Sequence, residues 1–222
     1  MILILRGHIR KSFENNDLLI FIKSIYNLYP ELTIYIHTWN IFSNNISWRN
    51  VQVNTQIVTE EIINTYFHDL KHLIKHIIID NDSNIELIGN TKGNINNGPM
   101  PIIGWKNYWY GKYNIINYIY NTNIDSKELI INCRFDVLNN SNTFNKEHLI
   151  KFITNNNKQN ITKNIFLFDH ECTGIDNFYL GNKTTIYKLS NMFFYNLDDI
   201  LSKNTDTINQ ERLVFRINNT IN

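Results

Sequence analysis

The feature that most constrains the fold is the alternation of short apolar runs with segments of helical periodicity. Five runs are apolar or β-branched and end at polar residues: 2–5, 32–37, 77–79, 129–133 and 165–168. Apolar positions recur on one helical face from about residue 16 to 28, and an aromatic helix is predicted over about 104–120. Strands that alternate with helices give right-handed crossovers and a mainly parallel sheet with helices on both faces. We therefore predict an α/β fold.

Two further helices are expected. Thr59 can cap a helix that carries Glu60 and Glu61 in its first turn and runs to about Lys75. Another helix is expected from about Lys183, followed by a mixed tail. Within the first of these helices, three histidines recur at every fourth position: His68, His72 and His76. We interpret them as a solvated helix face rather than as a metal-binding stripe.

The chain is expected to be one domain. Its 222 residues contain no internal repeat and no linker rich in Pro, Gly or Ser, so residues 1–222 are assigned to a single domain. A hydrophobic fraction of 43% is enough for a substantial core. Only two cysteines are present, which argues against a disulfide framework and against a cysteine-based zinc site.

Charge and hydropathy limit the partners. The formal net charge is +1 without a basic run, which argues against a nucleic-acid-binding surface. No apolar run approaches the roughly 20 residues of a membrane span, and the N-terminal residues do not form a secretory signal. We therefore expect a cytoplasmic protein, in the host cytoplasm if the chain is viral, with no nucleic-acid partner and no membrane span.

Polar residues follow the predicted strands, at the edge where parallel sheets bind ligands. The strand ends carry Arg6-Gly7-His8, His37-Thr38-Trp39-Asn40, Asp80-Asn81-Asp82, Arg134-Phe135-Asp136 and Asp169-His170-Glu171. Because the carboxyl ends of parallel strands meet at one edge, these segments are predicted to line one cleft.

The segment Arg134-Phe135-Asp136 is the first candidate for chemistry. A carboxylate at a strand end can hold a divalent cation through oxygen, and that cation can stabilise charge on a diphosphate. Arg134 can pair with a phosphate or hold the carboxylate of Asp136. The alternative is an ordinary Arg–Asp pair at the surface.

Asp80-Asn81-Asp82 is the rival metal site, since two carboxylates one residue apart can share a cation. Asp and Asn are also common turn residues, so a plain turn is the alternative. His170 is a further candidate metal ligand. The aromatic residues of the 104–120 helix can stack on a sugar or a base, although Trp109 is expected in the core. The chain has no glycine-rich phosphate loop.

Four segments, taken in order, resemble GT-A-like glycosyltransferases of polysaccharide loci and large DNA viruses. They are Ile4–Arg10, Ile36-His37-Thr38-Trp39-Asn40, Trp109-Tyr110 followed by Arg134-Phe135-Asp136, and Gly174–Gly181. The resemblance covers most of the chain, from about Ile2 to Leu189. The size of the chain is also similar to that of a chlorella-virus glycosyltransferase domain that acts on capsid glycans.

The resemblance implies a sugar transfer from a UDP- or GDP-linked sugar to a glycan or glycoprotein acceptor. It implies that the donor binds to Arg6, Gly7, Arg10, Thr38 and Arg134. Asp136 would take the place of the final Asp of a DxD motif and hold Mn²⁺ or Mg²⁺. The chain departs from that pattern because Arg134 stands where the first Asp is expected.

Asp176 completes the implied site. In a predicted loop between Gly174 and Gly181, it would bind the acceptor hydroxyl or act as general base. The alternative is an Asp that caps the next helix. Two other functions stay open: an inactive interaction module with a GT-A-like fold, favoured by Arg134, and another nucleotide-using enzyme such as a nucleotidyltransferase.

Overall fold

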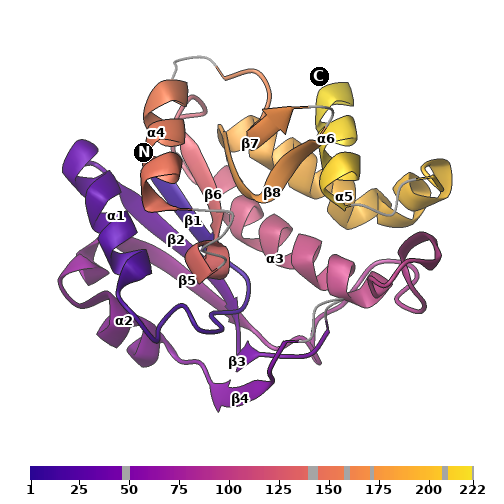
Figure 1. Cartoon of the computed structure of the whole chain (residues 1–222), viewed down its shortest axis with the longest axis horizontal. Helices are drawn as coiled ribbons and strands as arrows, with labels where there is room; N and C mark the ends of the chain where they lie inside the picture. Colours follow the sequence, from indigo (N-terminus) through magenta and orange to yellow (C-terminus); the bar gives the residue numbers. More distant parts are fainter. Residues whose placement is uncertain (47–50, 140–144, 158–160, 171–172, 207–209, 222) are drawn as a thin grey trace.

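A six-stranded sheet forms the centre of the computed structural model (Figure 1). The structure describes residues 1–46, 51–139, 145–157, 161–170, 173–206 and 210–221, apart from the side chains of residues 97, 168–170 and 173–175. The strands lie in the order β5 (Ile74–Asp80), β2 (Thr33–Trp39), β1 (Ile2–Arg6), β6 (Ile130–Arg134), β8 (Thr173–Gly181) and β7 (Ile165–His170). β8 is antiparallel to both neighbours and the other pairs are parallel, so the prediction of a mainly parallel sheet is confirmed.

The direction of winding reverses at β1. The chain moves outward from β1 to β2 and β5, and then returns to the other side of β1 as β6. Such a reversal is where open α/β sheets bind ligands, beyond the carboxyl ends of the strands. At this point Arg6 of β1 lies in register with both His37 of β2 and Arg134 of β6.

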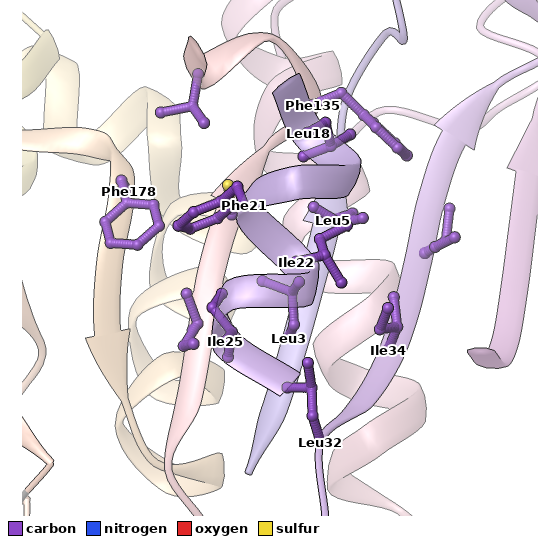
Figure 2. Packing of buried hydrophobic residues seen from close by; sticks show 14 of the residues in the cluster. Leu3, Leu5, Leu18, Phe21, Ile22, Ile25, Leu32, Ile34, Phe135 and Phe178 are labelled. Carbon is purple, nitrogen blue, oxygen red and sulfur yellow. The ribbon is translucent and has the colours of Figure 1, made fainter. Parts of the chain in front are cut away.

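Helices cover both faces of the sheet, as predicted. The helices α1 (Asp17–Leu28), α2 (Glu60–Phe67) and α4 (Lys146–Asn156) pack on one face. The helices α3 (Ile102–Tyr120), α5 (Lys183–Lys203) and α6 (Gln210–Thr220) pack on the other. In Figure 2, Phe21 and Ile22 of α1 lie against Leu3 and Leu5 of β1. Among the described residues, no helix combines the length and apolarity needed to cross a bilayer.

The helix α3 is the main support of the second face. Trp105 and Trp109 are both fully buried, which confirms the core position predicted for Trp109. The ring of Trp109 stacks on Phe193 of α5 with the centroids 4.1 Å apart. This contact ties α3 to α5, and one side of α3 is thereby held over the carboxyl edge of β1.

The predicted extent of the helix after Thr59 is wrong. Thr59 does cap α2, and its side chain accepts a hydrogen bond from the backbone of Ile62. The helix ends at Phe67 instead of Lys75, because His68 has a positive φ of 45° and starts the 3-10 segment η1 (His68–Leu73). His76 then falls in β5, so the three histidines do not share one helix face.

The segment around Asp176 is a strand and not the predicted loop. Phe178 and Leu180 of β8 pack into one hydrophobic core and Tyr179 into the other, so this strand is buried on both faces. The next helix, α5, is capped by Asn182 together with Thr185, which also excludes Asp176 as its cap. A two-stranded hairpin, β3 (Ile41–Ser43) with β4 (Asn54–Ile57), and the 3-10 segments η2 (Ile95–Asn97) and η3 (Phe135–Asn139) were not predicted.

Candidate functional site

A pocket of about 440 Å³ opens at the carboxyl edge of the sheet, beside the reversal at β1. Residues from β1, β2, β6, β8, α3 and α6 contribute to its wall. The lining comprises Arg6, Gly7, His8, Arg10, His37, Trp39, Asn44, Ile46, Ile95, Pro99, Met100, Gly104, Asn107, Tyr108, Gly111, Lys112, Arg134, Asp176, Asn177, Gln210 and Glu211. The pocket therefore brings together four cationic side chains, from positions that are distant in the sequence.

Arg6 is almost completely buried, with 2% of its surface exposed. It follows the apolar run of β1, and the alternation of a strand turns its side chain toward α3. Its Nε donates to Asn132 Oδ1 at 2.5 Å, and its Nη2 donates to the hydroxyl of Tyr108 and to the carbonyl of Asp176, both at 2.9 Å. All three acceptors are neutral, and Nη1 has no hydrogen-bond partner among the described residues.

Lys112 is a second buried cation and was not identified from the sequence. It is fully buried on α3, and its Nζ lies 4.2 Å from the ring centroid of Tyr108 and 4.1 Å from that of Trp109. Its Nζ donates a hydrogen bond to the carbonyl oxygen of Asp176 at 3.3 Å. Burial, followed by repulsion from Arg6, holds the pKa of Lys112 well below its ordinary value. The signal that was missed is helical spacing, because Tyr108 and Lys112 are four residues apart on one face.

The carbonyl of Asp176 accepts three hydrogen bonds, from Arg6, Tyr108 and Lys112. Its carboxylate takes a different partner, since Oδ2 accepts from Gln210 Nε2 of α6 at 2.8 Å. Asp176 is 4% exposed and lines the pocket. The backbone contacts fix the start of β8, and this leaves the carboxylate at the pocket wall.

The carboxylate of Asp136 is held by two arginines. Arg134 donates through Nε to Oδ1 at 2.8 Å and through Nη2 to Oδ2 at 2.5 Å. Arg10 donates through Nη1 to Oδ2 at 2.6 Å. Burial alone would raise the pKa of Asp136, but attraction to Arg134 and Arg10 outweighs it and lowers this pKa to about 2. Asp136 is therefore ionised and both of its oxygens are occupied by guanidinium donors.

This donor set does not fit a divalent cation. A metal ion bound to Asp136 would have to displace guanidinium groups that already neutralise it, and it would lie beside two positive charges. Within the described part of the chain, no three His, Cys, Asp or Glu side chains gather closely enough to hold a metal ion. The residues around Asp136 thus form a cationic site instead of an oxygen-rich one.

Asp80 and Asp82 lie outside the pocket lining. Asp80 Oδ2 is 3.1 Å from His37 Nε2 and accepts from Asn114 Nδ2 at 2.8 Å. Burial would raise the pKa of Asp80, but the contact with His37 outweighs it and lowers the pKa. Asp82 accepts from Asn44 Nδ2 at 2.6 Å. The two carboxylates are thus engaged in separate contacts. His170 ends β7, and its side chain lies outside the described residues.

Thr38 and Gly7 shape the turn that follows β1. Thr38 is fully buried and its hydroxyl donates to the carbonyl of Gly7 at 3.0 Å, so it supports the turn and does not line the pocket. Gly7 has a φ of 87°, a conformation that side-chain-bearing residues rarely adopt. No described heavy atom lies within 4 Å of the place where a Cβ would stand, so the glycine leaves room beside Arg6.

Aromatic and apolar side chains also line the pocket. Trp39 stacks on Tyr110 of α3 with the centroids 6.0 Å apart, and His8 lies 5.9 Å from Trp39. Burial, followed by repulsion from Arg10, lowers the pKa of His8 to about 3, so this imidazole is neutral at pH 7. Ile46 and Met100 add apolar surface. The pocket wall therefore combines arginines and a lysine with aromatic and apolar side chains.

The fold and the pocket define an α/β protein with an arginine-lined pocket where the sheet reverses its winding. Of the residues predicted from the sequence, the structure brings Arg6, Gly7, Arg10, Arg134 and Asp176 to one pocket and leaves Thr38, Asp80, Asp82 and Asp136 out of its lining. In comparison with known proteins, no protein-family description and no curated protein matches the chain.

Proposed function

We propose that the chain binds a UDP- or GDP-linked sugar and transfers the sugar to a hydroxyl of a glycan or glycoprotein. The observation that carries the proposal is the buried pair of Arg6 and Lys112, whose side-chain hydrogen bonds to the described residues reach only neutral acceptors. Burying a charged group is unfavourable unless it is well paired, and an anionic ligand would add a charged partner to the carboxylate of Asp176, which attracts Lys112. The unpartnered Nη1 of Arg6 is a donor available to such a ligand.

The shape of the pocket supports a nucleotide as the ligand. A volume of about 440 Å³ lies within the usual range for small-molecule sites. The arginines of the lining suit a diphosphate, because guanidinium groups donate several hydrogen bonds to phosphate oxygens. The aromatic side chains of the lining, Trp39 and His8, suit a flat base. The resemblance to GT-A-like glycosyltransferases supports the sugar as the transferred group.

In the proposed reaction the acceptor hydroxyl oxygen bonds to the anomeric carbon, while the bond from that carbon to the β-phosphate oxygen breaks. The nucleoside diphosphate leaves with the bonding electrons, and Arg6 balances its negative charge. The proton of the hydroxyl passes to the carboxylate of Asp176, which lines the pocket. The cytoplasmic location expected from the sequence stays a prediction.

The test is calorimetry of the full chain with UDP, GDP and UMP, followed by an assay for release of UDP or GDP from their sugar conjugates. We expect UDP or GDP to bind at least tenfold more tightly than the monophosphate UMP, because the second phosphate adds contacts with the arginines that line the pocket. Arg6→Gln should weaken this binding on the order of 10- to 100-fold, since charged hydrogen bonds are stronger than neutral ones. Arg216→Gln, an exposed arginine of α6 outside the pocket, is the matched control.

The same experiments separate the other two functions. Release of inorganic diphosphate from a nucleoside triphosphate, without release of a nucleoside diphosphate from a sugar nucleotide, would identify a nucleotidyltransferase. Binding of neither nucleotides nor sugar nucleotides would favour the inactive interaction module.

A further inference from the structure

The three residues Arg10, Arg134 and Asp136, here called the Arg–Asp–Arg triad, stand where the resemblance implies a metal site. The triad holds one carboxylate between two guanidinium groups, with N–O distances from 2.5 to 2.8 Å. Its formal charge is therefore +1. The side chains are only partly covered, with 24% of Arg10, 21% of Arg134 and 12% of Asp136 exposed. Arg10 and Arg134 line the pocket, whereas Asp136 does not.

The triad is rigidly placed. Arg134 ends β6, directly in register with Arg6 of β1. Its third guanidinium nitrogen, Nη1, donates to Asn177 Oδ1 of β8 at 3.0 Å. A guanidinium has more N–H groups than these contacts use, so Arg134 keeps donor capacity toward the pocket. Two neighbouring strands thus present arginines to the same space, and a third arginine reaches it from the turn after β1.

We propose that the Arg–Asp–Arg triad, together with Arg6, replaces the divalent cation and holds the diphosphate of the sugar nucleotide without metal. This inference rests on the proposed function and specifies how its leaving group is stabilised. Each phosphate of the diphosphate carries one negative charge, and the triad and Arg6 each supply one positive charge. Fixed donors aimed at a leaving group act as an electrostatic stabiliser that needs no reorganisation during the reaction.

In this arrangement Asp136 is a positioning residue. It spaces two guanidinium groups that would otherwise repel each other, and it reaches the diphosphate only through them. Removing its charge should loosen this spacing and lower the affinity for a diphosphate only in part, because both guanidinium groups remain. A metal-binding Asp136 predicts a different result, since loss of its charge would abolish metal-dependent binding.

The experiment measures, by calorimetry, the binding of inorganic diphosphate, UDP and GDP to the full chain in EDTA and in Mn²⁺. In EDTA we expect inorganic diphosphate and one of the nucleotides to bind the wild-type chain, with affinities within about threefold of those in Mn²⁺. Arg134→Gln should weaken both on the order of 10- to 100-fold. In EDTA, Asp136→Asn should still bind inorganic diphosphate, though less tightly than wild type, and Asp199→Asn, an exposed Asp of α5, is its control.

The outcomes are distinct. Binding that is lost in EDTA, restored by Mn²⁺ and absent in Asp136→Asn overturns the inference and leaves the proposed function intact. Metal-free binding of inorganic diphosphate, without binding of UDP or GDP, supports the triad and overturns the proposed function. No binding of any of the three under either condition overturns both. The EDTA comparison uses wild type alone, so the test holds even if a variant does not fold.

Discussion

At the scale of single residues, the backbone and the side chain of Asp176 have separate tasks. Its carbonyl oxygen accepts from Arg6, Tyr108 and Lys112, while its carboxylate accepts from Gln210. Because the backbone contacts do not involve the carboxylate, a change of the side chain can leave the start of β8 in place. The chemistry proposed for Asp176 can therefore be tested separately from the fold.

Asp176→Asn removes the charge and keeps a side chain of the same size. If Asp176 is the general base, turnover should fall on the order of 10² to 10⁴ while donor affinity changes by less than about threefold, since this group acts only when the acceptor reacts. Steady-state rates and calorimetry on the same preparation measure the two effects. Unchanged turnover by a folded variant would remove Asp176 from the mechanism.

At the scale of secondary-structure elements, the pocket depends on how closely α3 approaches the sheet. The spacing of Gly104, Tyr108, Gly111 and Lys112 places one face of α3 over the carboxyl edge of β1 and β2. A Cβ on Gly111 would lie 2.6 Å from His37 Cε1, which is closer than real contacts allow. The glycine therefore sets the distance between α3 and β2.

Gly111→Ala should lower the free energy of unfolding by about 1–3 kcal/mol, because overpacking outweighs the gain in helix propensity. Gly104→Ala is the matched control on the same face, since its Cβ would lie 3.2 Å from the carbonyl oxygen of Ile46 and needs only a small adjustment. Urea denaturation of both variants gives the comparison. Equal stability of the two variants would show that His37 moves freely away from α3.

The elements show what could be predicted from the sequence. The strands β1, β2 and β6 were predicted because short apolar runs that end at polar residues, such as 2–5 and 129–133, are typical of buried parallel strands. The strand β8 was missed because Gly174, Asp176 and Asn177 are typical of a loop, and the burial of Phe178 to Leu180 on both faces is a property of the tertiary structure. The premature end of α2 depends on the positive φ of His68, for which the local sequence carries no signal.

The site was predicted only in part, because some of its residues are brought together by tertiary packing. Arg6 and Arg134 end apolar strands, so their place at the ligand edge follows from the parallel sheet. Lys112 and Gln210 come from helices whose orientation depends on packing, and neither was identified. The carboxylate of Asp136 and its pairing with Arg134, two residues away, were predicted, whereas its other partner, Arg10, lies 126 residues away in the sequence and was not.

At the scale of the whole molecule, stability should depend on pH through buried charges. His8 has its pKa lowered to about 3, by burial and by Arg10, with Asp136, His37 and Arg134 also acting on it. In the unfolded chain this imidazole titrates near 6.5, so between pH 6.5 and 3 the unfolded state binds more protons than the folded state. Stability is therefore lost as the pH falls through this window. Asp136, with a pKa of about 2, adds a second loss between pH 3.8 and 2.

His8→Gln removes the first of these losses. Its free energy of unfolding should fall less steeply than that of wild type between pH 6.5 and 4, by up to about 1.4 kcal/mol per pH unit. Denaturant titrations at a series of pH values measure the difference, and His148→Gln, an exposed histidine of α4, is the control. If the free energies of unfolding of wild type and His8→Gln change with pH in parallel, His8 accepts a proton in the folded state as readily as in the unfolded one.

The wall of the pocket runs from Arg6 near the start of the sequence to Glu211 near its end. During synthesis on the ribosome, β1, β2 and α1 emerge early, but the start of β8 and the first turn of α6 emerge late. Contacts between such distant segments form slowly, because a long loop must close before they stabilise the chain. The arginines at the ends of β1 and β6 therefore lack this part of the pocket wall until the chain has been made as far as α6. A nascent chain arrested before Gln210 should form β1, β2 and β5 and still lack the part of the pocket wall that α6 contributes.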